Sequence, residues 1–209
     1  MTMIEVTNLR KAFGKKTLFD GFNISISKNE FVVFSGESGC GKTTLMNMIG
    51  AIEPFDNGFI EVSGLDVSSK KNKMKLFREI YGFVIQNYAL VEDKTVKENL
   101  SFVMKKYSSG VPVEDALKFV ELTNVEEKKV YKLSGGEQQR VALARLLIKK
   151  CSIILADEPT GSLDKRNADH VMDILKNLRT HGKTIVLVTH NDDIKREGDR
   201  VVCLDRKAQ

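Results

Sequence analysis

The stretch Gly36-Glu37-Ser38-Gly39-Cys40-Gly41-Lys42-Thr43-Thr44 decides the fold of this chain. It follows the apolar run Phe31-Val32-Val33-Phe34 and precedes the helical pattern Leu45-Met46-Asn47-Met48-Ile49. Its glycines, lysine and threonine fit the P-loop pattern G-x-x-x-x-G-K-[ST], and the order strand, loop, helix is the context that this pattern requires. The stretch therefore predicts a phosphate-binding turn between a buried strand and a helix.

The composition of this loop suits it to hold phosphate groups. Its glycines let the backbone turn tightly and aim N–H groups at an anion, and the following helix adds the positive end of its dipole. We expect Lys42 to reach the β- and γ-phosphates of a nucleotide and Thr43 to ligate Mg²⁺. The rest of the cradle is expected to come from Gly36, Ser38, Gly39, Cys40, Gly41 and Thr44. The alternative is a glycine-rich turn that matches the pattern by chance.

The composition is that of a soluble globular protein. The chain has 209 residues, of which 42% are hydrophobic and 29% charged, so it can bury a sizeable core as one domain or as a domain with a subdomain. No apolar run approaches the ~20 residues that span a bilayer, and the N-terminus does not resemble a signal peptide. Three scattered cysteines indicate a reducing cytosol rather than a disulfide framework or a metal site.

The charge balance leaves two interpretations open. A net charge of +5 would suit nucleic acid or an anionic membrane surface. The densest basic run is Lys70, Lys71, Lys73 and Lys75. A solvated helix or loop also explains this run.

Apolar patterning predicts alternating strands and helices. Half-buried strands are expected at residues 3–6 and 22–27, and buried strands at 31–34, 152–156 and 184–189. Further strands are expected at 59–62, 81–85 and 199–204. Helices are expected after the P-loop, near residues 72–79 and over 165–180, where His170 and His181 are interpreted as structural. From Gln86 to about residue 130 the pattern is helical and contains no apolar strand. This block therefore predicts a helical subdomain inserted into an α/β core.

A second informative stretch is Leu133-Ser134-Gly135-Gly136-Glu137-Gln138-Gln139-Arg140. Ser134 can cap the helix that follows, with Glu137 in the position of a capping box. The glycine pair exposes backbone N–H groups at a helix start, which makes a second phosphate site possible. The alternative is that this stretch only caps a helix.

Two further strands end in residues suited to nucleotide chemistry. The strand that begins at Ser152 ends in Asp157 and Glu158, where one carboxylate can hold Mg²⁺ and the other can polarise water. The stretch Gly161-Ser162-Leu163-Asp164 follows it. The strand that begins at Thr184 ends in His190.

In this order along the chain, the four stretches resemble the ATP-binding cassette (ABC) family, whose signature motif reads LSGGQ. Glu137 followed by Gln138 is a common variant of that motif. The resemblance implies that Gln86 contacts Mg²⁺ and the attacking water, that Phe13 stacks on adenine and that Asp164 belongs to the D-loop. It further implies that Lys42 and His190 stabilise the γ-phosphate and that Glu158 is the general base.

The resemblance covers essentially the whole chain and implies its architecture. We expect an α/β fold with a mostly parallel P-loop NTPase sheet, an N-terminal antiparallel β subdomain and an inserted helical subdomain. Residues 1–86 and 147–209 would form the nucleotide-binding core, and residues 87–146 the helical signature subdomain. No C-terminal regulatory domain is expected.

The function that the resemblance implies is ATP hydrolysis that drives export. ATP and Mg²⁺ are the expected ligands, with Thr43, Gln86 and Asp157 at the metal. Two chains would form a head-to-tail homodimer in which Ser134, Gly135 and Gly136 cover the ATP of the other chain. Membrane permease subunits are the expected partners, at the cytoplasmic face of the membrane, and no nucleic acid is expected.

Within the family, the P-loop and signature segments resemble those of the macrolide-export, lipoprotein-release and bacteriocin-export ATPases. Three alternatives remain: an ATPase that drives a cell-wall regulatory complex, a nucleic-acid ATPase, and a P-loop kinase. The absence of a long coiled coil or a second cassette argues against the nucleic-acid type. The Leu133–Arg140 stretch and Glu158 argue against a kinase.

Two smaller expectations concern Cys40 and residues 87–91. We expect the Cys40 thiol to be accessible and shielded by nucleotide, the alternative being a thiol that points into the core. The apolar segment 87–91 either helps form a groove for a membrane subunit or packs inside the helical subdomain.

Overall fold

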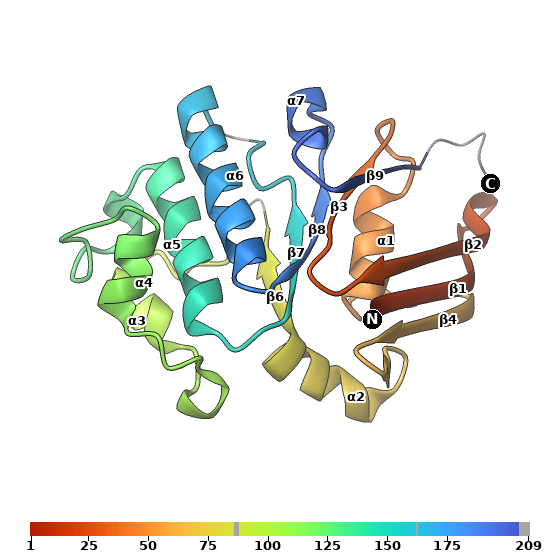
Figure 1. The fold of residues 1–209 in the computed structure, drawn as a ribbon, viewed down its shortest axis with the longest axis horizontal. Coiled ribbons are helices and arrows are strands. Elements are labelled where there is room, and N and C mark those ends of the chain that lie inside the picture. Colours follow the sequence, from red (N-terminus) through yellow and green to blue (C-terminus); the bar gives the residue numbers. More distant parts are fainter. Residues whose placement is uncertain (86–87, 162, 205–209) are drawn as a thin grey trace.

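The computed structural model describes residues 1–85, 88–161 and 163–204, and a five-stranded sheet lies at its centre (Figure 1). The strand order is β6-β7-β8-β3-β9, and all neighbouring strands are parallel. The strands are β3 (Phe31–Ser35), β6 (Tyr81–Val84), β7 (Ile153–Asp157), β8 (Thr184–Val188) and β9 (Arg200–Cys203). The five runs predicted as strands at 31–34, 81–85, 152–156, 184–189 and 199–204 are therefore confirmed, with small differences at their ends. The edge strand β9 is only partly buried.

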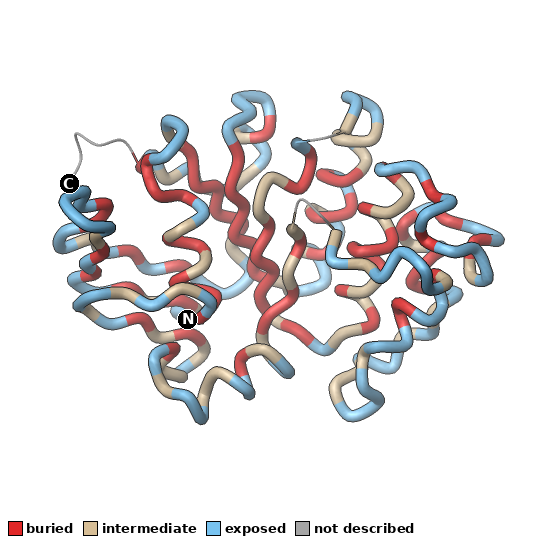
Figure 2. Tube along the Cα trace, turned by 180° about the vertical axis from the view of Figure 1, so that it is seen from behind, coloured by how far each residue is buried: buried red, intermediate tan, exposed pale blue. Residues whose placement is uncertain are grey.

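The central strands β7, β8 and β3 are buried on both faces, which explains why they are apolar without alternation. Phe31 and Val33 of β3 point into one hydrophobic cluster, together with residues of α5 (Gly135–Ile148) and α6 (Lys165–Thr180). Val32 and Phe34 point into a second cluster, with α1 (Lys42–Ile49) and the second sheet. Figure 2 shows this buried band through the middle of the molecule.

The second sheet is antiparallel, as expected for the N-terminal part of the chain. It consists of β1 (Thr2–Phe13), β2 (Lys16–Ser27), β4 (Asn57–Val62) and β5 (Leu65–Asp66), in the order β2-β1-β4-β5. The first two strands are far longer than the predicted segments 3–6 and 22–27. Several register shifts interrupt the β1–β2 ladder. These irregularities break the strict alternation on which the sequence prediction relied.

Helices α5 and α6 cover one face of the sheet and α1 the other. The remaining helices are α2 (Lys70–Lys75), α3 (Val96–Ser101), α4 (Val113–Phe119) and α7 (Asp192–Lys195). The helix predicted near 72–79 is α2 continued by a π-helical turn, Leu76–Ile80. The helix predicted over 165–180 is confirmed, and His181 is its C-cap. Among the described residues, no helix has the length and apolar composition needed to cross a bilayer.

The block between β6 and β7 is helical, although less regular than its pattern indicates. It contains α3, α4 and α5, which lie together on the side of the molecule away from the antiparallel sheet (Figure 1). Short 3-10 turns at Lys105–Tyr107 and Val130–Lys132 join these helices. The predicted boundaries between the nucleotide-binding core and the helical subdomain, at residues 86/87 and 146/147, stay predictions.

The parallel register brings distant parts of the sequence to one edge of the sheet. Phe34 pairs with Val188, and Val188 also pairs with Asp157. The P-loop, Glu158 and Thr189 therefore follow their strands at the same carboxyl edge, where ligands of open α/β sheets bind.

A buried tyrosine ties β6 to α1. The Tyr81 hydroxyl donates to the Ile49 carbonyl at 2.5 Å, and burial raises the pKa of Tyr81 well above its ordinary value, so the proton stays available. Tyr81→Phe should lower the free energy of unfolding by about 1–2 kcal/mol, because it leaves a buried carbonyl without its donor. Urea unfolding followed by circular dichroism measures this loss. Tyr131→Phe, at a half-exposed site, is the control, and an equal effect of both variants would contradict the role of the hydrogen bond.

Candidate active site

The loop between β3 and α1 is held in a shape that only glycine tolerates at key positions. Gly41 has φ +107°, and a Cβ added there would lie 2.9 Å from the Phe19 ring. Helix α1 begins directly after it, at Lys42. The Lys42 ammonium donates to the carbonyls of Gly36 at 2.7 Å and Glu37 at 2.8 Å. The lysine therefore lies folded over the loop, 8% exposed, with its charge at the centre of the predicted cradle.

The Thr43 hydroxyl, in the first turn of α1, lies next to the Asp157 carboxylate, at the end of β7. Thr43 Oγ1 donates to Asp157 Oδ1 at 3.1 Å. Burial raises the pKa of Asp157 above its ordinary value, and the Glu158 charge adds to this. A carboxylate whose charge is disfavoured next to a hydroxyl oxygen fits a divalent cation, because both are hard oxygen ligands of the kind that Mg²⁺ takes.

Glu158 is fixed at the end of β7 by contacts with the end of β8. Its backbone has φ +44°, a left-handed conformation that costs about 1–3 kcal/mol outside glycine and is held by its surroundings. Its N–H donates to the Val188 carbonyl at 3.0 Å. Its carboxylate oxygens contact His190 Nδ1 at 2.7 Å and the Thr189 hydroxyl at 3.3 Å. Glu158 and His190 therefore form one unit at the carboxyl edge.

A cavity of about 480 Å³ joins these groups to the tip of the β1–β2 hairpin. Phe13 from that tip is 51% exposed and lies at the cavity together with Glu158 and His190. The full lining is Phe13, Lys16, Leu18, Ser38, Gly39, Gly41, Lys42, Thr43, Thr44, Glu158, Val188 and His190. Most of the predicted cradle thus surrounds one cavity that an aromatic ring borders.

Cys40 lies outside this cavity. Its side chain is 3% exposed and belongs to the hydrophobic cluster around α1, with its sulfur 3.8 Å from Lys42 Nζ. The expectation of an accessible thiol is therefore wrong, and the alternative of a thiol that points into the core holds. The loop turns its glycine backbone toward the cavity and packs its one apolar side chain beneath.

Lys16 is a cavity residue that sequence reasoning missed. Its ammonium donates to the Gly39 carbonyl at 3.2 Å, from the start of β2 to the loop. Thr189 was missed as well, although its hydroxyl reaches Glu158. The pair Lys15-Lys16, two residues after Phe13, is a sequence signal that could have predicted Lys16 at the nucleotide site. Nothing in the sequence pattern singled out Thr189.

The second predicted phosphate site lies apart from the cavity. Ser134 caps α5 through a complete capping box with Glu137. Behind it, Gly136 packs so closely on Asn167 that a Cβ would lie 2.6 Å from Oδ1. Asn167 in turn donates to Asp164, the N-cap of α6, through Nδ2 at 2.7 Å. Ser134, Gly135, Gly136 and Asp164 therefore form a separate cluster at the start of two helices.

The segment after Gln86 is tied to the same helix. Gln86 and Asn87 lie outside the described residues, so the predicted contacts of Gln86 stay predictions. Tyr88 and Ala89 both have positive φ, +58° and +48°, and the Arg145 guanidinium of α5 donates to their carbonyls at 3.1 and 2.6 Å. Leu90 packs against the core while Val91 is 48% exposed, so the segment has both a buried and an open side.

The family model described as "ABC transporter" matches residues 19–161 of this chain. The chain is 37% identical to the lipoprotein-releasing system ATP-binding protein LolD of Bacteroides fragilis, over 96% of both chains. It is 35% identical to the macrolide export ATP-binding/permease protein MacB of Mannheimia succiniciproducens over 97% of this chain. The chain spans 33% of that relative's length.

Among solved structures, the dimeric bacterial ABC transporter cassette MJ0796 has a TM-score of 0.83 to this chain at 34% identity, covering 97% of this chain and 94% of that one. A dimeric post-hydrolysis state of the same cassette, bound to ADP and Pi, has a TM-score of 0.81 over 96% and 94% of the two chains.

The capping box of α5 predicts a pH-dependent effect. The Ser134 N–H donates to the Glu137 carboxylate at 2.8 Å, which lowers the pKa of Glu137. The ionised carboxylate therefore stabilises the folded state above the unfolded pKa of about 4.3, and this contribution is lost as the pH falls through the folded pKa. Glu137→Gln should lower the unfolding free energy by about 0.3–1 kcal/mol at neutral pH, with a difference that vanishes in acid.

Urea midpoints over a pH series measure this difference. Glu92→Gln is the control, because the Glu92 carboxylate makes no hydrogen bond or salt bridge within the described part of the chain. A Glu137→Gln difference that does not change with pH would contradict the electrostatic role of the box.

Proposed function

The chain belongs to the ABC transporter family, and we propose that it is the ATP-hydrolysing subunit of a membrane exporter. The observation that carries this proposal is that the P-loop with Thr43 and the Glu158–His190 unit line one cavity, while Asp157 is hydrogen-bonded to Thr43 at its edge. Phosphoryl transfer to water needs positioned phosphates, a metal site and a group that orients the nucleophile. All three requirements have candidates at this edge of the sheet.

The phosphates of ATP would lie against the backbone of Gly36, Ser38, Gly39, Cys40, Gly41 and Thr44. Lys42 would exchange its two carbonyl partners for phosphate oxygens, because an ammonium forms stronger hydrogen bonds with an ionised acceptor. Phe13, half exposed at the mouth of the cavity, would stack on adenine. Lys16 is placed to face the same nucleotide.

Thr43, Asp157 and Gln86 would hold Mg²⁺. When bound there, Mg²⁺ supplies positive charge that balances the phosphate oxygens. The Glu158 carboxylate would take a proton from water, and His190, hydrogen-bonded to that carboxylate, would contact the γ-phosphate. The strained backbone of Glu158 and its bond to Val188 keep the carboxylate at one position relative to the cavity.

The Ser134–Gly136 and Asp164 cluster supports a site shared between two chains. It offers backbone N–H groups at a helix start, yet it does not line the cavity of its own chain. A head-to-tail homodimer would place it over the ATP of the partner. Such a twofold arrangement closes on itself and forms no filament, and the similar cassette MJ0796 is described as dimeric.

The partners would be permease subunits, with the chain at the cytoplasmic face of the membrane and no nucleic acid as substrate. The names of the relatives, macrolide export and lipoprotein release, support export. A peptide, bacteriocin or antibiotic is the class of cargo we propose. Selection of the cargo would lie in the permease.

Glu158→Gln tests the general base. The amide keeps the shape and one contact to His190 but does not accept a proton, so ATP turnover should fall by ~10²-fold or more. ATP binding should persist and lock a dimer, as seen by size-exclusion chromatography. Glu127→Gln, at a 77% exposed carboxylate, is the control. Near-normal turnover by Glu158→Gln would exclude the assignment.

Mixing two inactive variants tests the shared site. Lys42→Ala and Ser134→Arg should each be inactive, because every site of either homodimer carries one defect. In a mixed dimer one site carries both defects and the other none, so partial ATPase activity should return. Tagged pull-down with ATP confirms that heterodimers form.

Confirmed heterodimers without activity would contradict either the shared site or the sufficiency of one site. Crosslinking between Ser38→Cys on one chain and Ser134→Cys on the other, in a Cys40→Ala background, separates these two explanations.

A further inference from the structure

The turn that follows Glu158 keeps its shape against its own backbone preference. Glu158 has φ +44°, and the next residue is Pro159, which favours extended backbone in the residue before it. Contacts with neighbouring groups must therefore hold Glu158 in place. Two of them are backbone hydrogen bonds: the Glu158 N–H donates to Val188, and the Glu158 carbonyl accepts from the Gly161 N–H at 3.1 Å.

A third contact comes from a side chain of α5. Gln139 Nε2 donates to the Pro159 carbonyl at 2.9 Å, and Gln139 is 0% exposed. A hydrogen bond in the interior does not compete with water, so it is electrostatically stronger than the same bond at the surface. Gln139 therefore fixes the carbonyl group directly after Glu158.

Packing alone does not account for an amide at position 139. Gln139 Oε1 is buried and has no hydrogen-bond partner among the described residues, and burying an unpaired acceptor costs free energy. A methionine or leucine side chain would occupy a similar volume without that cost. The amide donor is thus what distinguishes Gln139 from an apolar residue that would fill the same space.

Helix α5 is attached to the neighbouring segment without Gln139. Positions 136, 139 and 140 lie on one face of the helix. Gly136 packs on Asn167, and Arg140 Nη1 donates to Asn167 Oδ1 at 3.0 Å. These two residues contact the start of α6, whereas Gln139 contacts the residue after Glu158. The bond from Gln139 is therefore suited to hold the turn rather than the helix.

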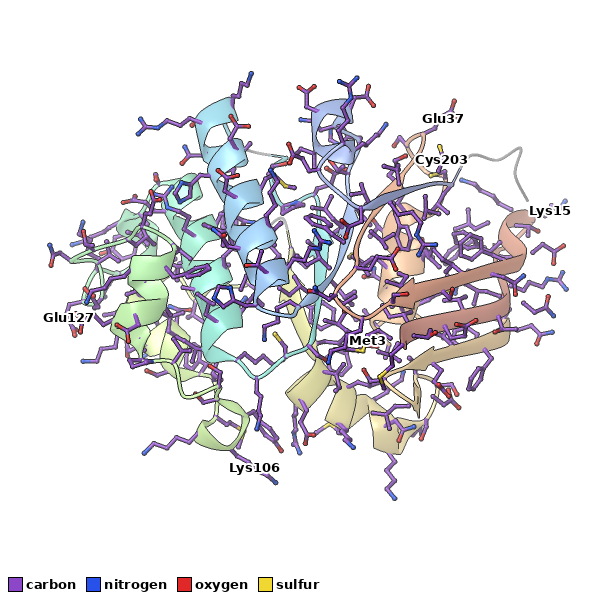
Figure 3. The ribbon with its side chains drawn as sticks, in the orientation of Figure 1. Met3, Lys15, Glu37, Lys106, Glu127 and Cys203 are labelled. Atoms are coloured by element: carbon purple, nitrogen blue, oxygen red, sulfur yellow. The ribbon has the colours of Figure 1, made fainter. Side chains whose placement is uncertain are left out.

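Gln139 approaches this turn from the side of the helical block between β6 and β7. Helices α5 and α6 lie side by side (Figure 1), and Glu127 of the helical block lies on the far side of them from Glu37 of the P-loop (Figure 3). Within the described part of the chain, the lining of the nucleotide cavity does not include Gln139. A change at Gln139 should reach Glu158 without touching the P-loop.

From these observations we propose that Gln139 is a positioning residue. It holds the Pro159 carbonyl and thereby keeps the Glu158 carboxylate where it accepts a proton from the attacking water. The inference rests on the proposed function, in which Glu158 is the general base, and adds a residue of α5 to it. Gln139 itself neither contacts the nucleotide nor transfers a proton.

Gln139→Met removes the donor and keeps an unbranched side chain. ATP turnover should fall about tenfold or more, because a small displacement of a catalytic group can cost about 10² in rate. The affinity for ATP, measured by equilibrium dialysis, should stay unchanged. The matched control is Asn72→Leu, which removes a part-buried amide that donates to the Asp66 carbonyl at 3.0 Å. It should keep normal turnover, and thermal melting of both variants corrects for any unfolded fraction.

Combining Gln139→Met with Glu158→Gln separates positioning from a general structural role. If Gln139 acts through Glu158, Gln139→Met should change the residual single-turnover rate of Glu158→Gln by less than about twofold, since residues that act as a unit are not additive. A loss by the same factor in both backgrounds would overturn the proposal in favour of a brace that serves the whole site.

Gln139→Glu keeps the shape and offers a donor only while its carboxyl group is protonated. Burial raises the pKa of a carboxyl group, so the neutral form donates to Pro159 at low pH and is lost as the pH rises through that pKa. The ratio of its turnover to that of the unmodified chain should be close to one at acid pH and highest there. Equal losses by Gln139→Glu and Gln139→Met at every pH would overturn the role of the donor.

The mixed dimer shows on which chain Gln139 acts. Its intact site combines Glu158 of the Ser134→Arg chain with Ser134 of the Lys42→Ala chain. Gln139→Met should abolish the recovered activity when it is added to the Ser134→Arg chain and not when it is added to the Lys42→Ala chain. The opposite result would assign the effect to the Ser134 cap and overturn the proposal.

Glu158→Gln alone distinguishes failure of this inference from failure of the proposed function. Retained turnover in Glu158→Gln would remove the general base and the positioning role with it. Lost turnover in Glu158→Gln with normal turnover in Gln139→Met would overturn the positioning role only.

Discussion

The register of the parallel pairs β7–β8 and β8–β3 is the constraint on which the rest of the structure depends. Val188 pairs with both Asp157 and Phe34, so the three chain segments leave the sheet side by side. The two hydrophobic clusters that enclose β3 fix this register, because a slip of one residue would exchange Val33 and Phe34 between the two clusters. The site is thus a consequence of how the core packs.

The carboxyl edge is built at a cost to stability. Asp157 has a raised pKa because its charge is buried, and Glu158 is held at a positive φ. Both features disfavour the folded protein, and a bound cation would offset the first of them. Strain of this kind at a functional edge is compensated by the packed clusters beneath it.

Helix α5 connects the parts of the molecule that a shared ATP site would need to coordinate. Its first turn carries the Ser134 cap and the Gly136–Asn167 contact, which leads to Asp164. Two turns later, Arg145 holds the carbonyls of Tyr88 and Ala89, directly after Gln86. A displacement of α5 would therefore move the Ser134–Gly136 cluster and the segment after Gln86 together. Such a coupled movement is what we expect to connect the nucleotide site to a permease.

The sequence by itself determined the family, the order of elements and most of the cavity lining, because the P-loop and the strand ends are local patterns whose chemistry is visible in a few adjacent residues. It did not determine where the Cys40 side chain points, the length of β1 and β2, or the roles of Lys16 and Thr189. These features depend on packing. The Cys40 side chain occupies space beneath the P-loop, and register shifts interrupt the ladder between β1 and β2. The pairing of β8 with β7 brings Thr189 to Glu158. The basic run over 70–78 was visible from the start, but only the tertiary structure placed Arg78 over the Tyr107 ring, since contacts between segments separated by tens of residues leave no periodic trace in the sequence.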